Sequence, residues 1–140
     1  MMAATAVMQT PRTGELVFDE GLLGFPQCRT FRLLATEHDG LYWLESTDCP
    51  PLAFLLADPF QFYDGYGIDL NDFDLKALRP ADPADIAVLV TVTLNGGAEP
   101  TANLRGPIAI NLATGRGRQV IVNNSEFGVR QPIRLELSAR

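Results

Sequence analysis

The sequence predicts an all-β domain, a small antiparallel barrel or sandwich with one or two short helices. Short runs of β-branched and bulky apolar residues recur along its 140 residues, and turn-forming residues separate them. The connections suit antiparallel hairpins, and only one segment has the cap and apolar spacing of a helix. With 46% hydrophobic residues, a single domain of this length can bury a core without disulfides or a structural metal.

The predicted strands differ in their expected burial. In the second strand, Phe31 and Leu33 alternate with other residues, which indicates a half-buried strand. The run of bulky residues from 86 to 94 predicts a central strand, and the Asn95-Gly96-Gly97 turn ends it. In chain order, the predicted strands are Glu15–Phe18, Arg29–Ala35, Leu41–Ser46, Leu52–Ala57, Ile86–Leu94, Pro107–Leu112 and Arg118–Asn123.

One helix is predicted between the fourth and fifth of these strands. Asn71 is the expected N-cap, and Asp72 and Asp74 lie in the first turn, where carboxylates meet the positive end of the helix dipole. The apolar stripe ends at Leu78, and Pro80 stops the helix.

Charge is distributed unevenly along the chain. The formal net charge is −6, but residues 37–99 carry twelve acidic and two basic residues, whereas residues 100–140 carry two acidic and six basic residues. An acidic middle argues against non-specific binding to nucleic acid, which needs several Lys or Arg contacts to phosphates. It suits either a well-solvated surface or a basic partner.

Metal and nucleophile chemistry is poorly represented. A zinc site needs at least three well-spaced protein ligands, and the chain has only Cys28, Cys49 and His38 as Cys or His residues. We expect both cysteines to be reduced and partly buried, and His38 to lie in an exposed loop. The Asp-rich run 69–74 lacks the glycine of a calcium loop. We therefore predict no enzyme activity, no metal and no cofactor.

An aromatic segment, residues 58–67, holds four aromatic and two acidic residues. Two interpretations fit it. Phe60 and Phe62 could lie on the buried face of an edge strand, or the segment could form an exposed acidic and aromatic patch of the kind found in protein interfaces.

A series of motifs is more specific than any one of these features. Together they resemble the bacterial flagellar assembly factor FliW family, in the family's order and from about Gly14 to Ile133. The motifs are Gly24-Phe25-Pro26, Leu41-Tyr42-Trp43-Leu44-Glu45-Ser46, Leu52-Ala53-Phe54, Asp58-Pro59-Phe60, the run from Thr101 to Asn111, and Gly117-Arg118-Gln119-Val120-Ile121.

The resemblance implies a non-enzymatic regulator with an antiparallel β-barrel-like fold. Proteins of this family bind CsrA, a dimeric RNA-binding repressor of flagellin translation. They also bind flagellin, and binding of one partner excludes the other, so that the two partners form a switch. We expect a flexible segment 1–13, a FliW-like domain over 14–134 and a tail over 135–140. The chain lacks a secretory signal, which predicts a cytoplasmic protein, and we expect a monomer when it is free.

The predicted partner-binding residues come from this sequence and not from a contact list of the family. They are Phe60, Phe62, Tyr63, Asp64 and Tyr66, with Asn103 and Arg105 as a second group. Asn103 and Asn111 could instead be structural, with side chains bonded to the backbone at strand ends. Two alternative functions remain: a flagellin chaperone that does not bind CsrA, and a barrel that binds a small ligand.

Overall fold

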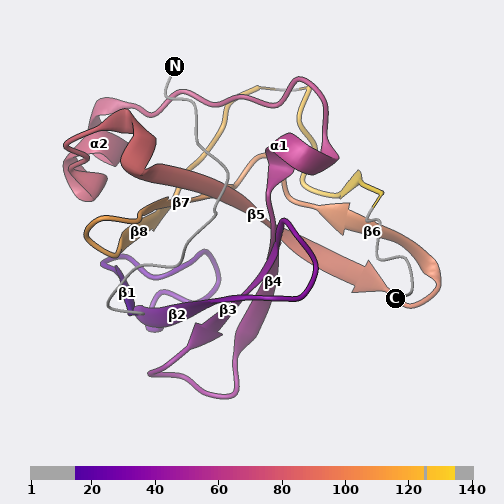
Figure 1. The fold of residues 1–140 in the computed structure, drawn as a ribbon, viewed down its shortest axis with the longest axis horizontal. Helices are drawn as coiled ribbons and strands as arrows, with labels where there is room; N and C mark the ends of the chain where they lie inside the picture. Colours follow the sequence, from indigo (N-terminus) through magenta and orange to yellow (C-terminus); the bar gives the residue numbers. More distant parts are fainter. Residues whose placement is uncertain (1–14, 125, 135–140) are drawn as a thin grey trace.

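The chain forms a β-barrel with two short helices on its outside (Figure 1). The structure is a computed structural model that describes residues 15–124 and 126–134. The predicted segment 1–13 and tail 135–140 lie outside the described residues, so both remain predictions. The strands are β1 (Leu16–Phe18), β2 (Thr30–Ala35), β3 (Leu41–Ser46), β4 (Ala53–Ala57), β5 (Ile86–Asn95), β6 (Ala98–Ala102), β7 (Ile108–Asn111), β8 (Arg116–Gln119) and β9 (Gln131–Pro132); the helices are α1 (Pro59–Phe62), α2 (Asp72–Leu78) and the 3-10 turn η1 (Pro83–Asp85).

Seven of the strands close into a ring. Their order is β4-β3-β2-β1-β8-β7-β5, and pairing between β4 and β5 completes it, while β6 and β9 extend the sheet beyond β5. Closure removes free edges from the ring, and a free edge is a site for unwanted pairing. The predicted all-β barrel is confirmed.

One pair in the ring is parallel. β1 and β8 run in the same direction, with Val17 opposite Arg116 and Phe18 opposite Gly117. Strands in a ring of seven cannot alternate in direction all the way round, so one parallel neighbour is unavoidable. Gly117 is required at this seam because the Phe18 ring occupies the space that a Cβ would take.

β5 is buried on both faces, which explains its long apolar run. Ala87 and Leu89 face the interior of the barrel, in one core cluster with residues of β1, β2, β3, β4 and β7. Val88 and Val90 point to the other face of the sheet, where a second cluster includes Leu78 of α2. The predicted central strand is confirmed, and it joins the two parts of the core.

The last hairpin starts earlier than predicted. β8 spans Arg116–Gln119 instead of 118–123. The turn is tight, because the Gly115 N–H donates to the Asn111 carbonyl at 2.7 Å and Gly115 has a φ of 83°. The strands β6 and β9 were not predicted from the sequence; β6 contains Pro100, and β9 has only two residues.

Helix α2 has the predicted cap and end. The Asn71 side chain accepts from the Asp74 N–H at 2.8 Å, and the Asp74 carboxylate accepts from the Asn71 N–H at 3.1 Å, which is a capping box. Arg79 takes the left-handed conformation at the end, just before Pro80. Among the described residues, no helix is long and apolar enough to cross a membrane.

The prediction of reduced cysteines is wrong, because Cys28 and Cys49 form a disulfide. The register of β2 and β3 explains it. Phe31 lies opposite Ser46, and the same register continued three residues from this pair brings Cys28 opposite Cys49. Their Cα atoms are 5.8 Å apart, a normal disulfide separation. Neither cysteine suggests this pairing until the hairpin register is known.

Candidate partner-binding surface

The aromatic segment 58–67 forms α1 and the loop after it. The edge-strand interpretation is therefore wrong. Asp58 caps the helix, since its Oδ1 accepts from the Phe60 N–H at 3.0 Å, and Pro59 stands at the first helical position. The Asp58 side chain is buried, and this burial raises the pKa of its carboxyl group.

The five residues predicted for binding in this segment lie at different depths. Phe60 is 38% exposed, and Asp64 is exposed as well. Phe62 and Tyr63 are half-buried against the outer core cluster. Tyr66 is only 7% exposed. The exposed patch is thus smaller than expected, and it consists mainly of Phe60 and Asp64 with the edges of the half-buried rings.

Tyr66 links the two predicted groups from below the surface. Its hydroxyl donates to the Leu104 carbonyl at 2.7 Å, and its ring centroid lies 4.8 Å from that of Phe127. Burial raises the pKa of Tyr66. Because Leu104 stands between Asn103 and Arg105 in the chain, this bond holds the second predicted group beside the first.

The structural role considered for two asparagines is confirmed. The Asn103 Oδ1 accepts from the N–H groups of Arg105 and Gly106 at 3.1 and 3.0 Å and so shapes the turn between β6 and β7. The Asn111 Nδ2 donates to the Leu78 carbonyl at 2.9 Å, which binds β7 to the end of α2. Arg105 itself is exposed.

An open groove that was not predicted from the sequence lies where β4 and β5 separate. Their pairing stops at Leu55 and Val92; beyond it β4 continues beside β3, and β5 continues beside β6 (Figure 1). The space between them has a volume of about 540 Å³. We call it the apolar groove; its walls include Leu23, Trp43, Ala53, Phe54, Leu55 and Leu94.

The strand register places apolar residues side by side in this groove. Trp43 pairs with Leu55 and Leu55 with Val92, and directly opposed residues share one face of a sheet. Trp43 is 42%, Leu94 59% and Leu23 64% exposed. In the neighbouring row, Leu41, Ala57 and Val90 belong to the buried core. A tryptophan at an outward strand position was the signal in the sequence that could have revealed the groove.

The two amide side chains in the groove lining, Gln119 and Asn103, are already engaged. The Gln119 Oε1 accepts from the Leu23 N–H at 2.8 Å, and its Nε2 donates to the Gly106 carbonyl at 2.8 Å. Asn103 accepts from the backbone, as described above. These amides therefore support the groove walls and do not converge on its space.

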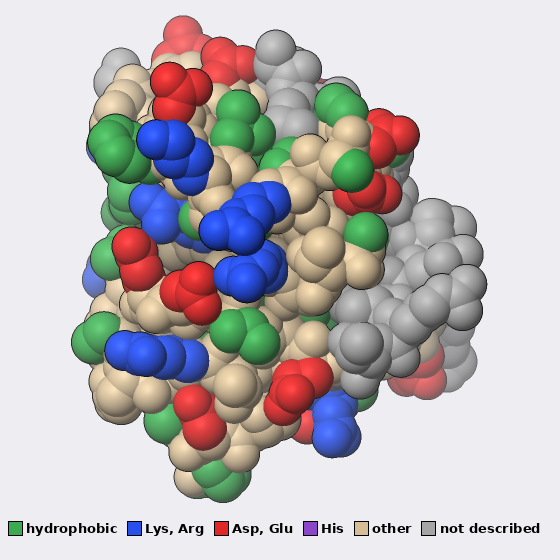
Figure 2. Space-filling model, turned by 90° about the vertical axis from the view of Figure 1, so that its left-hand side faces the viewer, with side chains coloured by type: hydrophobic (Ala, Val, Ile, Leu, Met, Phe, Trp, Pro, Cys, Tyr) green, Lys and Arg blue, Asp and Glu red, His purple; other side chains and the backbone are tan. Residues whose placement is uncertain are grey.

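A second hollow, of about 330 Å³, lies on the other side of Leu22 and Leu23 and is charged. Arg116 bonds Asp19 at 3.2 Å, and Arg118 bonds Glu20 at 3.0 Å. Figure 2 shows the face of the molecule on the side of β1, β8 and α2, where basic and acidic side chains are interspersed. On this face the acidic residues do not form a patch of one sign.

Comparison with known proteins identifies the family. The profile of the family described as "FliW protein" matches residues 3–133. The chain belongs to the FliW family. Flagellar assembly factor FliW of Clostridium beijerinckii is 32% identical over 120 residues, which cover 84% of this chain and 85% of that protein. The FliW of Geobacillus thermodenitrificans is 37% identical over 114 residues, which cover 79% and 77%.

A solved structure supports the same assignment. The crystal structure of a flagellar assembly factor FliW matches with a TM-score of 0.82 and 31% identity, over 94% of this chain and 93% of that one. The family and the barrel fold predicted from the motifs are thus confirmed. In residues 15–124 and 126–134, no group of three or more His, Cys, Asp or Glu side chains is arranged to hold a metal ion.

Proposed function

We propose that this FliW-family chain binds the translational repressor CsrA and flagellin in a mutually exclusive partner switch. Binding of CsrA relieves the repression of flagellin translation, and binding of flagellin ends that relief. The chain acts in the cytoplasm as a non-enzymatic monomer without a cofactor. The observation that carries this proposal is the apolar groove, a hollow lined by exposed apolar side chains among the described residues of a FliW fold.

Flagellin is the partner proposed for the apolar groove. A subunit that awaits polymerisation exposes apolar surface, which its polymer later buries. The groove offers the complement, since Leu23, Trp43 and Leu94 expose apolar side chains around one hollow. Large aromatic side chains at the centre of a site often contribute most of the binding energy, which makes Trp43 the expected anchor.

CsrA is the partner proposed for the surface around α1. An RNA-binding protein presents basic residues, and exposed carboxylates would attract it and would repel RNA phosphates near it. Asp64 is exposed and lies four residues after the exposed Phe60 in the chain. Asp58 and Asp74 are buried, so the surface charge of the acidic segment is smaller than its composition indicates.

The groove can be tested with its own fluorophore, because Trp43 is the only tryptophan of the chain. Flagellin should shift the Trp43 emission to shorter wavelength as the indole leaves water. Calorimetry should show that Trp43→Ala weakens flagellin binding by about 30-fold, which corresponds to about 2 kcal/mol. Phe73→Ala, which removes an exposed ring of α2 outside the groove, is the matched control and should bind normally.

The CsrA surface can be tested by gel shift with CsrA and flagellin leader RNA. The chain should release the RNA, and Asp64→Lys should require about tenfold more protein for the same release. Glu99→Lys makes the same charge change on β6 and should act like the unmodified chain. Equal release by the two variants would remove Asp64 from the proposed interface.

Competition separates the switch from its alternatives. Added flagellin should displace CsrA from a preformed complex. Binding of flagellin without CsrA would leave the chaperone function alone, and binding of neither partner would overturn the proposal. The small-ligand alternative has less support, because Gln119 and Asn103 in the groove already bond to the backbone.

A further inference from the structure

The loop that connects β1 to β2, residues 19–29, forms part of both hollows. Leu22 and Leu23 lie in the lining of the apolar groove and also in that of the charged hollow. Leu23 is the most exposed of the large apolar side chains in the groove. The position of this loop therefore decides the shape of the groove wall.

Two non-covalent contacts hold the middle of the loop. The Leu23 N–H donates to the Gln119 side chain at 2.8 Å, and the Phe25 ring meets the Phe54 ring edge-on at 5.4 Å between centroids. Phe25 and Leu22 also exchange backbone hydrogen bonds at 3.3 and 2.7 Å, which form a short internal turn.

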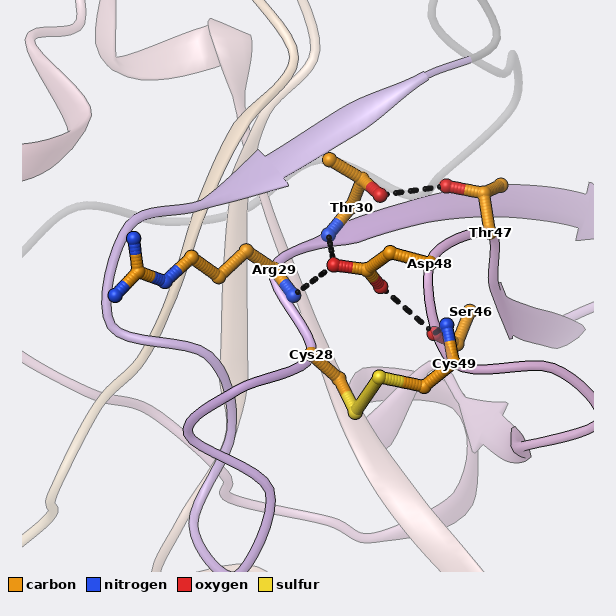
Figure 3. Close-up of a disulfide and its surroundings, with 7 residues drawn as sticks. All are labelled: Cys28, Arg29, Thr30, Ser46, Thr47, Asp48 and Cys49. Atoms are coloured by element: carbon orange, nitrogen blue, oxygen red, sulfur yellow. Dashed lines mark hydrogen bonds between the residues drawn. A yellow bond between two sulfur atoms is a disulfide. The ribbon is translucent and has the colours of Figure 1, made fainter.

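The disulfide ties the end of the loop to the turn between β3 and β4, which leads into Phe54 of the groove (Figure 3). Cys28 is 1% exposed, whereas Cys49 is half-buried. The two cysteines are 21 positions apart and flank the β2–β3 hairpin, so the bond fixes Cys28, at the end of the loop, to the turn after β3. A cross-link restricts the positions that its two ends and the residues next to them can take.

Asp48 provides a second connection at the same place. Its Oδ2 accepts from the N–H groups of Arg29 and Thr30 at 2.9 and 3.3 Å, and its Oδ1 accepts from the Ser46 hydroxyl at 3.0 Å (Figure 3). These hydrogen bonds do not depend on the sulfur–sulfur bond. Loss of the disulfide would therefore release Cys28 and the loop residues before it, while Asp48 would still hold Arg29 and Thr30 at the start of the β2–β3 hairpin.

We propose that the Cys28–Cys49 disulfide is a reversible redox latch, which orders the loop 19–29 and with it the wall of the apolar groove. The oxidised chain holds a preformed groove, and the reduced chain has to order the loop when a partner binds. This consequence for binding rests on the function proposed above, whereas the effect on the loop does not.

The co-reactant is a dithiol. One of its thiolates attacks the sulfur of Cys49, the more accessible of the two residues; the bond between the two cysteines breaks, and Cys28 leaves as a thiolate that takes up a proton. The second thiolate of the reductant then attacks the mixed disulfide and releases Cys49, which also takes up a proton. The reductant is oxidised to a disulfide, and two electrons reach the chain. A disulfide oxidant reverses the steps.

Hydrogen exchange of the full chain tests the effect on the loop without any partner. Exchange of the Leu22 and Leu23 amides, which are hydrogen-bonded in the oxidised chain, should become at least about tenfold faster after reduction with dithiothreitol. The amides of β5 serve as the internal control and should change little. A variant with both Cys28→Ser and Cys49→Ser should exchange like the reduced chain, with or without dithiothreitol.

A flagellin titration of both redox forms tests the effect on the groove. The reduced chain should bind about tenfold more weakly, and the double serine variant should match it in either condition. Unchanged exchange on reduction, or two thiols that an added disulfide oxidant does not rejoin, would overturn the latch. Faster exchange with equal affinity would overturn its influence on the groove. Absence of binding in both forms would count against the proposed function, and the exchange result would still decide the latch.

Discussion

Asp74 combines a role visible in the sequence with one that the fold adds. The sequence predicts it in the first turn of α2, and its carboxylate indeed accepts from the Asn71 N–H. The same side chain accepts from the Arg118 Nε at 2.7 Å and is buried. The hydrogen bond to Asp74 is the main reason why the pKa of Arg118 is raised. This ion pair links α2 to β8.

Asp74→Ala should therefore lower the free energy of unfolding by about 2–4 kcal/mol, since it removes a cap and leaves Arg118 without its shorter ion pair. Urea denaturation followed by circular dichroism would measure the loss. Asp72→Ala removes an exposed carboxylate from the same turn and should cost less than about 1 kcal/mol. Equal losses in the two variants would show that the ion pair contributes nothing.

For the β2–β3 hairpin, the sequence predicted both strands but not the disulfide that links their ends. The alternation of Phe31 and Leu33 predicted β2, and an apolar run before a turn predicted β3, but the link between the strand ends depends on the register. Asp48 takes part in that link. The hydrogen bond from the Arg29 N–H is the largest cause that lowers the pKa of Asp48 below its ordinary value of 3.8.

Acid stability should reveal this carboxylate. Because the pKa of Asp48 is lower in the folded chain than in the unfolded chain, the ionised group stabilises the fold above pH 3.8, and the stabilisation disappears as the pH falls through the lowered pKa. Melting temperatures measured from about pH 6 to about pH 2 should fall less steeply for Asp48→Asn than for the unmodified chain. Glu45→Gln removes one charge from the same hairpin as a control, and an identical slope in all three would contradict the assignment.

At the scale of the whole molecule, β5 joins two core clusters into one cooperative unit. Its alternate residues belong to the barrel interior and to the outer cluster under α2. The ring also needs β5, since pairing with β4 closes it. Because β5 contributes side chains to both clusters, a loss of packing in one cluster disturbs the other.

The chain should consequently unfold in a single transition. In urea, the Trp43 fluorescence, which reports on β3, and the far-ultraviolet circular dichroism, which reports on the whole sheet, should give coincident curves and one midpoint. The measurement should be made on the oxidised chain. Separate midpoints would show that the barrel and the outer cluster unfold independently.

The candidate site was less predictable than the fold. Phe60 and Asp64 are exposed as expected, but Tyr66 is buried, and sequence spacing could not show this because α1 replaces the strand that the alternation of Phe60 and Phe62 suggested. The apolar groove escaped prediction for a similar reason. It exists because β4 and β5 separate beyond Leu55 and Val92, and such a separation is a property of paired strands.

Local sequence patterns predicted seven of the nine strands in the described residues, the capped helix α2, the acidic middle segment and, through the motifs, membership of the FliW family. These features depend on neighbours along the chain or on short patterns of residue type. Tertiary structure alone decided the parallel seam of β1 and β8, the Cys28–Cys49 disulfide and the groove at Trp43. Each of these depends on which distant segments lie side by side, and that is settled only when the ring of strands closes.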